Sequence, residues 1–454
     1  MEVIHTQRDS SSHGAREEVT RVAVVLDNQP RPSDTLSLQP GANLLIAERE
    51  FRAAFGEPTS LEYDLLLLAS SIYSADIAAK RGHGEEFTRR IDIEVPVTNF
   101  PAFRAAREDI EYVLYLLTRD AWALRFVSHP GAAESPRQYA PASNATVLLF
   151  SGGLDSYSAA IALNNSSPLY LVSHTTGNRT ISRAQEALFS HLSSAPRQPL
   201  QRLHFRVGGR NSPARGFLFP SDTQREESQR SRSFLFVCLA ALSARRLATN
   251  RIIHIAENGL LAINVPLTAA RISAFSTQTA HPEFTFEAAR LLTDLLQHEI
   301  VIDNPFLYMT KAEVAGAIPP AHSSRIQDTV SCWMSARLHP PMTHCGTCIP
   351  CIIRRIALES LGVSLPEYRR DLFSEDILAL PPDDDGKNNL MDLIEFVSSF
   401  LSAGSDAELL TTFPELVNRH IDLRQAVDLY RRFSAEARRV LHAYPGPSLA
   451  LGPT

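Results

Sequence analysis

The chain of 454 residues is long enough for about three domains and for a sizeable hydrophobic core. Its hydrophobic fraction of 44% and charged fraction of 21% are those of a globular protein and argue against a mostly disordered chain. A net charge of −6, from 44 Lys+Arg and 50 Asp+Glu residues, gives no electrostatic reason to expect direct binding to nucleic acid or to an anionic membrane.

The sequence shows neither the pattern of a membrane span nor that of a secretion signal. The longest apolar run, residues 234–242, is far shorter than the ~20 residues that a spanning helix needs. The N-terminus, MEVIHTQRDSSSHG, is polar and lacks the apolar core of a signal peptide. We therefore expect a cytoplasmic protein without a membrane partner.

The N-terminal part of the chain is predicted to be an α+β domain behind a loose tail. Residues 1–21 are rich in Ser, Arg and Glu and are expected to be disordered, and residues 22–129 are expected to form an accessory domain. Its strands are predicted near 21–26, 87–97 and 121–129, and its helices near 62–81 and 101–117. Residues 130–145, rich in Pro, Ala and Ser, have the composition of a linker.

The sequence pattern changes at residue 146, where the main domain is expected to begin. Short apolar runs at 146–150, 168–173, 203–207 and 251–256 alternate with helical patterns. Apolar strands separated by helices are typical of a parallel sheet with helices on both faces. This α/β domain is expected to cover residues 146–361, followed by a helical C-terminal extension at 362–454. The acidic run at 383–385 is expected in a solvated loop.

A glycine-rich loop follows the first strand of the main domain. It reads SGGLDS and consists of Ser151, Gly152, Gly153, Leu154, Asp155 and Ser156. Two glycines allow a tight turn that points backbone N–H groups into one concavity, and the helix that follows adds its positive end. The loop is therefore suited to phosphate; the alternative is an ordinary turn capped by Asp155 or Ser156. Because Asp155 would repel a phosphate, we expect it to bind Mg²⁺ or to orient a bound group.

Four of the five cysteines are confined to residues 332–351, namely Cys332, Cys345, Cys348 and Cys351. Four thiolates suit a structural, tetrahedral Zn²⁺ site. An iron–sulfur cluster and disulfides are the alternatives. His339 and His344 lie in the same window and are expected to be solvated loop residues. Cys238 lies in an apolar helical pattern and is expected to be a buried, inert thiol.

The glycine loop resembles the SGGxDS loop of the PP-loop ATP pyrophosphatases. Those enzymes split ATP into AMP and pyrophosphate and activate an oxygen as its adenylate. The resemblance implies a parallel sheet of the adenine nucleotide alpha hydrolase-like type. It also implies that residues 151–156 bind ATP as a substrate and that the protein is an ATP-dependent ligase that forms a C–N bond.

Three further segments resemble QueC, the family of 7-cyano-7-deazaguanine synthases. CGTCIPCIIR at 345–354 resembles its zinc segment, NPFLYMTKAEV at 304–314 its TKxE segment, and RSRSFLFVCLAAL at 230–242 its RN…FLxLAxxxA helix, with Ser233 in place of the usual Asn. The resemblance covers about residues 146–361. It implies catalytic roles for Ser151, Asp155, Lys311 and Arg232 and a structural zinc held by the four clustered cysteines. Thr310 and Glu313 are expected to form a capping box, which leaves Lys311 as the contact to a phosphate or adenylate.

The segment between the fourth strand and the cysteines departs from QueC. Residues 256–284 lack the Asp and Cys of the corresponding family stretch, which holds the deazapurine. Open α/β sheets bind ligands on the carboxyl side of their strands, so this segment is expected to bind the substrate. Glu257 or Asn258 could recognise a guanine-like edge, and Arg271 could pair with a carboxylate. The full set of candidates is Glu257, Asn258, Arg271, Thr277, Thr279 and His281.

The two extensions make the chain longer than a compact QueC enzyme. This long form resembles the QueC-like proteins of bacterial anti-phage operons, namely QatC of the Qat system and the QueC-like enzyme of type IV CBASS. The resemblance implies activation of a 7-carboxy-7-deazaguanine-type carboxylate and its attachment, as an amide, to the N-terminal amine of a partner protein from the same operon. The alternatives are a free synthase with ammonia as acceptor and a non-catalytic nucleotide-binding scaffold. The intact Ser151, Asp155 and Ser156 favour an enzyme.

Overall fold

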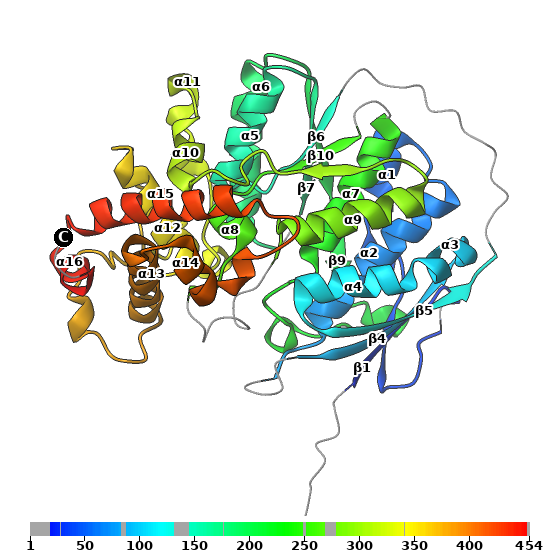
Figure 1. Ribbon diagram of the computed structural model, residues 1–454. Coiled ribbons are helices and arrows are strands. Elements are labelled where there is room, and N and C mark those ends of the chain that lie inside the picture. Colours follow the sequence, from blue (N-terminus) through cyan, green and yellow to red (C-terminus); the bar gives the residue numbers. More distant parts are fainter. Residues whose placement is uncertain are drawn as a thin grey trace, which may run out of the picture.

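The computed structural model describes residues 19–27, 29–82, 88–130, 145–175, 177–247, 251–267, 278–339 and 341–451 (Figure 1). The expected disordered tail at 1–21 lies outside this range except for residues 19–21, which already belong to the first strand. Most of the expected linker at 130–145 also lies outside the described residues. No helix in the described residues has the length and apolar character needed to cross a bilayer.

The N-terminal region contains a four-stranded sheet of order β2-β1-β4-β5. Its strands are β1 (Val19–Val24), β2 (Thr35–Leu38), β4 (Arg90–Val97) and β5 (Ala121–Ser128), and its helices are α1 (Glu48–Phe55), α2 (Ser60–Ala78), α3 (Phe100–Ala105) and α4 (Arg107–Thr118). All three strand pairings are parallel. The expected α+β class was therefore wrong for this region. Periodicity reveals that a segment is a strand but not the direction of its neighbour, and here each strand is paired through a crossover connection.

The central sheet has five parallel strands in the order β11-β10-β6-β7-β8. These are β6 (Thr146–Leu149), β7 (Leu169–His174), β8 (Leu200–Phe205), β10 (Ile252–Ile255) and β11 (Val301–Asp303). Strand order reverses on either side of β6, so the carboxyl ends of β6 and β10 form the switch point at which open sheets bind ligands. The parallel sheet predicted from the alternating apolar runs is confirmed.

Helices cover both faces of the central sheet, as predicted. Helices α5 (Leu154–Asn164) and α6 (Arg179–Ser194) pack on one face, through a core that includes Leu148, Leu171 and Leu188. Helices α7 (Arg232–Leu247) and α9 (Pro282–Leu296) pack on the other face, through a core that includes Val147, Val172 and Ile253. The remaining helices of this part are α8 (Gly259–Ile263), α10 (Lys311–Gly316) and α12 (Ile349–Ser360).

The C-terminal region is helical, also as predicted. Its helices are α13 (Asp385–Ser402), α14 (Asp406–Thr412), α15 (Leu423–Leu441) and α16 (Pro445–Leu451). They share an apolar core with α8 and α12, and Figure 1 shows them on the side of the central sheet opposite to the N-terminal elements. The acidic run is not simply a solvated loop, because the Asp384 carboxylate accepts a hydrogen bond from the Lys387 N–H and caps α13.

One apolar core crosses the predicted boundary between the N-terminal region and the main domain. Helix α2 packs against α7, and one buried cluster joins Leu65, Leu68 and Ile72 of α2 to Phe234 and Val237 of α7. Strand β3 (Leu44–Ile46) also pairs antiparallel with β9 (Val207–Gly209) of the main domain. The two regions are therefore held together as one body by a continuous hydrophobic interior.

Buried charges lie at both ends of the contact between α2 and α7. At one end Arg246 Nε donates to Glu62 Oε1 over 2.7 Å, and a second Arg246 nitrogen pairs with the other carboxylate oxygen. Glu62 is fully buried and also forms a capping box with Thr59 at the start of α2. At the other end Asp76 of α2 accepts from Ser231, just before α7 begins. The two helices therefore run antiparallel.

We predict that Glu62→Gln destabilises the protein by on the order of 3 kcal/mol, because it leaves the Arg246 charge buried opposite a neutral amide. Gln at this position keeps the acceptor of the capping box, so helix initiation is preserved. The control is Asp34→Asn, whose ion pair with Arg21 is 63% exposed on the Asp side; it is expected to change stability by less than about 1 kcal/mol. Urea unfolding of the full chain measures both variants. Equal effects of the two variants would contradict the prediction.

Candidate active site

The glycine loop forms a tight turn between β6 and α5. Gly152 has φ +84°, a left-handed conformation that favours glycine, and a Cβ there would lie 3.0 Å from the Gln185 Cγ. Helix α5 is preceded by Gly153, which has no side chain that could cap the helix. The alternative of a turn capped by Asp155 or Ser156 was therefore wrong, because both residues lie in the first turn of the helix. Peptide N–H groups at this end are suited to an anion.

Hydrogen bonds inside the loop fix its shape. Ser151 Oγ accepts from the Gly153 N–H over 3.2 Å and lies 3.2 Å from Ser156 Oγ. The Gly152 carbonyl accepts from the Val330 N–H over 2.9 Å, which ties the loop to the segment before the cysteine cluster. Ser151 is exposed while Ser156 is buried. A ligand in the loop would therefore meet the Ser151 hydroxyl first.

Asp155 forms a buried ion pair with Lys311 at the switch point. The Lys311 Nζ lies 2.8 Å from Asp155 Oδ1, and each residue is only 4% exposed. Asp155 Oδ2 accepts from both the backbone N–H and the side-chain Nδ2 of Asn258, over 3.0 and 2.9 Å. Burial raises the pKa of Asp155, but Lys311 and these hydrogen bonds outweigh burial and hold its pKa below the usual value. The structure thus brings together residues that are about 100 and 150 positions apart in the sequence.

Glu257 completes a group of oxygen ligands around Asp155. Burial and the neighbouring Asp155 carboxylate raise the pKa of Glu257 well above its usual value, so the two carboxyl groups share a proton. Asn258 Oδ1 is buried and has no hydrogen-bond partner among the described residues. Two carboxyl groups and an amide oxygen are the ligand types that Mg²⁺ prefers, so Asp155, Glu257 and Asn258 fit a Mg²⁺ ion. Both Glu257 and Asn258 face Asp155, a position that sequence spacing did not indicate.

The segment that carries Lys311 is held from two sides. Thr310 and Glu313 form the predicted capping box at the start of α10. Gly259 approaches the preceding loop so closely that a Cβ there would lie 2.2 Å from the Leu307 carbonyl oxygen. Its N–H donates to the Met309 carbonyl over 2.9 Å. These contacts align α8, with Asn258 at its start, against α10, with Lys311 at its start.

The C-terminal helix α15 packs on this segment from the outside. Thr310 Oγ1 donates to Glu436 Oε1 over 2.8 Å, and Arg432 pairs with Glu313 and donates to the Tyr308 carbonyl over 2.9 Å. Burial raises the pKa of Glu436. The C-terminal extension therefore supports the residues that position Lys311.

Arg232 lies at the same edge of the sheet, at the start of α7. Helix α7 leads into β10, so its first residue lies at the carboxyl ends of the strands. The guanidinium lies 4.8 Å from the Phe236 ring centroid, and its Nε is buried without a hydrogen-bond partner among the described residues. His174, the last residue of β7, packs on Phe236 with ring centroids 5.7 Å apart. Burial and the neighbouring Arg232 lower the pKa of His174 to about 3, so it is neutral.

The other predicted substrate residues are not joined to Asp155 by described contacts. Arg271 and Thr277 lie outside the described residues. Thr279 is half-buried in the turn before α9. His281 precedes α9 and its Nδ1 accepts from the Glu283 N–H over 3.2 Å, while burial lowers its pKa to about 4. His281 thus serves as a neutral helix cap, and its role toward a substrate remains a prediction.

The four clustered cysteines converge on one point. Their ligand atoms all lie within 4.8 Å of one another, and all four side chains are buried as free thiols. The Cys345–Cys351 and Cys332–Cys348 sulfur pairs are 3.9 and 4.0 Å apart. Sulfurs bound tetrahedrally at about 2.3 Å from a zinc ion lie about 3.8 Å apart. The group therefore fits zinc, and the alternative of disulfides was wrong.

Backbone geometry around the cysteines supports the same interpretation. The N–H groups of Cys345 and Met334 donate to Cys332 Sγ over 3.4 and 3.3 Å, as expected for a thiolate ligand. Gly346 has φ +82°, and a Cβ there would lie 2.0 Å from the Arg370 carbonyl oxygen, so only glycine fits between the first two cysteines of the CxxC pair. Cys238 is buried in α7 and burial raises its pKa, as expected for an inert thiol.

Arg354 and His344 link the cysteine cluster to the glycine loop. Arg354 is fully buried and donates to the Thr329 hydroxyl and the Ile326 carbonyl over 2.7 and 2.8 Å. His344 Nε2 accepts from the Ser331 N–H over 3.3 Å. The expectation that His344 is a solvated loop residue was wrong, whereas His339 is exposed. Because Val330 bonds to Gly152, this segment connects the cysteines with the phosphate-type loop.

Several supporting residues were not anticipated from the sequence. They are Asp76, Glu226, Arg230 and Ser231 beside Arg232, and Arg432 and Glu436 beside Lys311. The available signal was an acidic side chain within the apolar pattern of the helix at 62–81, which indicates a buried polar contact. Its partner cannot be identified without the tertiary structure.

The fold and site together define an α/β protein with an anion-binding loop, a buried acid–lysine pair and a four-cysteine cluster. Residues 231–362 match the family model described as Queuosine biosynthesis protein QueC. The chain is therefore QueC-like over this range, which includes Arg232, Asn258, Lys311 and the clustered cysteines but not the glycine loop. The predicted family resemblance is thereby confirmed.

No curated protein matches the chain in sequence. Among solved structures, a ketoreductase domain from the bacillaene assembly line aligns with 80% of this chain and 82% of its own length. The sequence identity is 10% and the TM-score is 0.19, which is too low to bear on fold or function.

We predict that the purified protein holds one zinc ion per chain and that Cys348→Ser loses it. Removing one thiolate breaks the tetrahedral set, so hydrogen exchange should increase over residues 332–354 and soluble yield should fall. Cys238→Ala is the matched control, because it removes a buried cysteine from α7 and should leave the zinc content unchanged. Elemental analysis measures the metal. Finding iron in its place, or no metal in the wild-type protein, would refute the zinc assignment.

Proposed function

We propose that the protein is an ATP-dependent ligase of the PP-loop type that activates a 7-carboxy-7-deazaguanine-type carboxylate. The observation that carries the proposal is the meeting of the glycine loop with Asp155, Lys311 and Asn258 at the switch point of the sheet. The QueC match over 231–362 supports the substrate class. It also supports enzyme status over a non-catalytic scaffold, since a scaffold would not require a buried lysine beside the nucleotide.

The proposed reaction has two steps. A carboxylate oxygen of the substrate attacks the α-phosphorus of ATP, the bond to the β-phosphate breaks, and pyrophosphate leaves. An amine nitrogen then attacks the acyl carbon of the adenylate, AMP leaves with the bonding electrons, and the amine loses a proton. The products are an amide, AMP and pyrophosphate.

The proposed roles of the residues follow from their positions. Backbone N–H groups of residues 151–156 would hold phosphate oxygens, with the Ser151 hydroxyl as an additional donor. Lys311 would neutralise negative charge that develops on the α-phosphate, while Asp155 orients its ammonium. Mg²⁺ held by Asp155, Glu257 and Asn258 would supply further charge neutralisation. Arg232 would bind an anionic group of the substrate at the same edge.

We predict that incubation with ATP and 7-carboxy-7-deazaguanine yields AMP and pyrophosphate in equal amounts. Asp155→Asn and Lys311→Ala should each lower turnover by about a hundredfold or more, because they remove groups aimed at the developing charge. The control is Ser166→Ala, an exposed serine just after α5. Chromatography of the nucleotides measures the products. Formation of ADP only, or unchanged turnover in the two variants, would contradict the assignment.

For the acceptor we propose the N-terminal amine of a partner protein encoded in the same operon, as part of an anti-phage system. Support comes from exposed aromatic side chains near the start of α9. Tyr112 and Tyr115 of α4 are 40% and 47% exposed, and Phe286 of α9 is 51% exposed. Tyr112 and Asn418 both bond to the Glu283 carboxylate, so α4, α9 and the C-terminal region meet here. Exposed aromatic groups of this kind are typical of protein-binding surfaces.

The second candidate is a free 7-cyano-7-deazaguanine synthase that uses ammonia. It is favoured by the finding that both extensions support the catalytic unit internally, through α2 on one side and α15 on the other. Extra length alone is therefore no evidence for a protein acceptor.

Co-expression with the neighbouring operon proteins distinguishes the two acceptors. We predict that intact-mass measurement shows one partner gaining the mass of the deazaguanine acyl group, and that Asp155→Asn abolishes the gain. Tyr115→Ala with Phe286→Ala should reduce the modification while leaving AMP formation with ammonia unchanged. If every partner keeps its mass while the enzyme releases 7-cyano-7-deazaguanine, the synthase is the correct function.

A further inference from the structure

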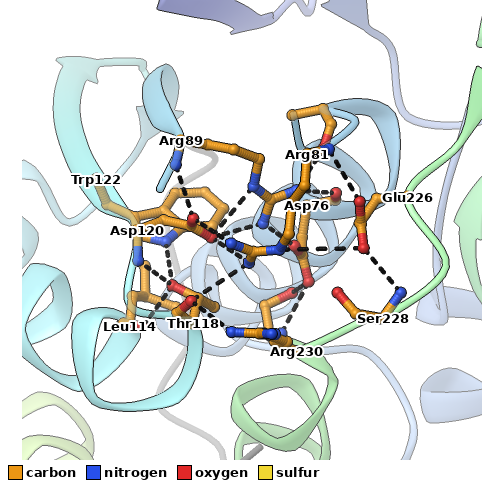
Figure 2. Close-up of polar contacts among 12 residues, drawn as sticks. Asp76, Arg81, Arg89, Leu114, Thr118, Asp120, Trp122, Glu226, Ser228 and Arg230 are labelled. Atoms are coloured by element: carbon orange, nitrogen blue, oxygen red, sulfur yellow. Dashed lines mark hydrogen bonds and ion pairs between the residues drawn. The ribbon is translucent and has the colours of Figure 1, made fainter. Parts of the chain in front are cut away.

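The segment 226–232, which leads into α7, is anchored almost entirely by the N-terminal region. The Glu226 N–H donates to the Ile77 carbonyl over 2.8 Å, and the Glu226 carboxylate accepts from the Arg81 N–H over 2.9 Å. Arg230 donates to the Thr118 carbonyl over 3.4 Å. Figure 2 shows these residues as part of one buried network that includes Asp76, Arg89 and Asp120. The N-terminal region therefore determines the path of the chain just before Arg232.

Asp76 holds the start of α7 directly. Its Oδ2 accepts from both the backbone N–H and the hydroxyl of Ser231, each over 2.8 Å. Asp76 is fully buried near the C-terminal end of α2, where the helix dipole disfavours a negative charge. Arg89 balances this charge, because it pairs with both Asp76 and Asp120. A buried carboxylate is thus kept ionised and aimed at the first peptide of the helix that carries Arg232.

Tyr73 acts one turn earlier on the same helix. Its hydroxyl donates to Gln229 Oε1 over 2.9 Å, and its ring packs edge-on to His174 at 5.2 Å between centroids. Gln229 has φ +45°, a left-handed conformation that costs a non-glycine residue on the order of 1–3 kcal/mol and persists only where neighbouring contacts enforce it. The Tyr73 hydrogen bond is such a contact.

These contacts converge on Arg232, whose guanidinium lies over Phe236 with an unpartnered, buried Nε. We propose that Tyr73 and Asp76 are positioning residues that set the Arg232 guanidinium at the carboxyl edge of the central sheet, ready for the anionic group of a substrate. The N-terminal region is then an integral part of the active site. This inference rests on the proposed function for the identity of the anion but not for the geometry.

The test compares Tyr73→Phe and Asp76→Asn with Ser74→Ala. Ser74 lies between them on α2 and is equally buried, but its hydroxyl has no hydrogen-bond partner among the described residues. Tyr73→Phe keeps the ring and removes only the bond to Gln229, so it should fold normally even if Asp76→Asn does not. Hydrogen exchange of the free protein over residues 229–236 should accelerate in the first two variants and stay unchanged in Ser74→Ala.

Kinetics provide the second readout. Arg232→Lys, assayed with ATP and 7-carboxy-7-deazaguanine varied in turn, should raise the KM of the substrate that Arg232 binds. Tyr73→Phe should raise that same KM by about five- to tenfold, the effect of one lost hydrogen bond, and leave the other KM unchanged. A purely structural defect would instead lower the active fraction without favouring one substrate.

The two readouts separate the inference from the proposed function. Faster exchange at 229–236 with a shared rise in one KM supports the inference. Unchanged exchange in both Tyr73→Phe and Asp76→Asn, or a loss of activity with both KM values unaltered, overturns it. If the wild-type protein forms no AMP, the proposed function fails, and hydrogen exchange alone still decides whether α2 holds the start of α7.

Discussion

The structure depends on the burial of α7 between the central sheet and α2. Helix α7 is apolar on nearly every side, and the sheet can cover only one of them. Helix α2 covers the opposite side, which makes the N-terminal region part of the main hydrophobic core. The buried pair of Glu62 with Arg246 and the bond from Ser231 to Asp76 then fix the two helices in register, since only one alignment pairs both charges.

The catalytic centre is assembled from segments whose positions are set by this packing. The buried ion pair of Asp155 with Lys311 requires that α5 and α10 begin at the same edge of the sheet. The C-terminal helix α15 holds α10 through Glu436 and Arg432, while α2 holds the segment before Arg232. Both extensions therefore support the site from outside. A compact catalytic unit without them would expose the apolar sides of α7 and α8.

Local features were predictable because they depend on neighbouring residues. The glycine turn, the capping box of Thr310 and Glu313, the parallel central sheet and the four-cysteine cluster all follow from short-range patterns, and all are present. Predictions failed where a distant segment decided the outcome. The N-terminal sheet is fully parallel, His344 is buried against Ser331, and Asp384 caps a helix. Periodicity carries no information about such partners.

The sequence by itself determined the class of the main domain, the anion-binding loop and the metal-type cysteine cluster, because each is encoded in consecutive residues with fixed backbone requirements. Only the tertiary structure decided which side chains meet. It placed Glu257 and Asn258 against Asp155, and it placed Tyr73 and Asp76 beside the start of α7. Those contacts join residues far apart in the chain, and their energy comes from burying polar groups together, which becomes favourable only when the surrounding core excludes water.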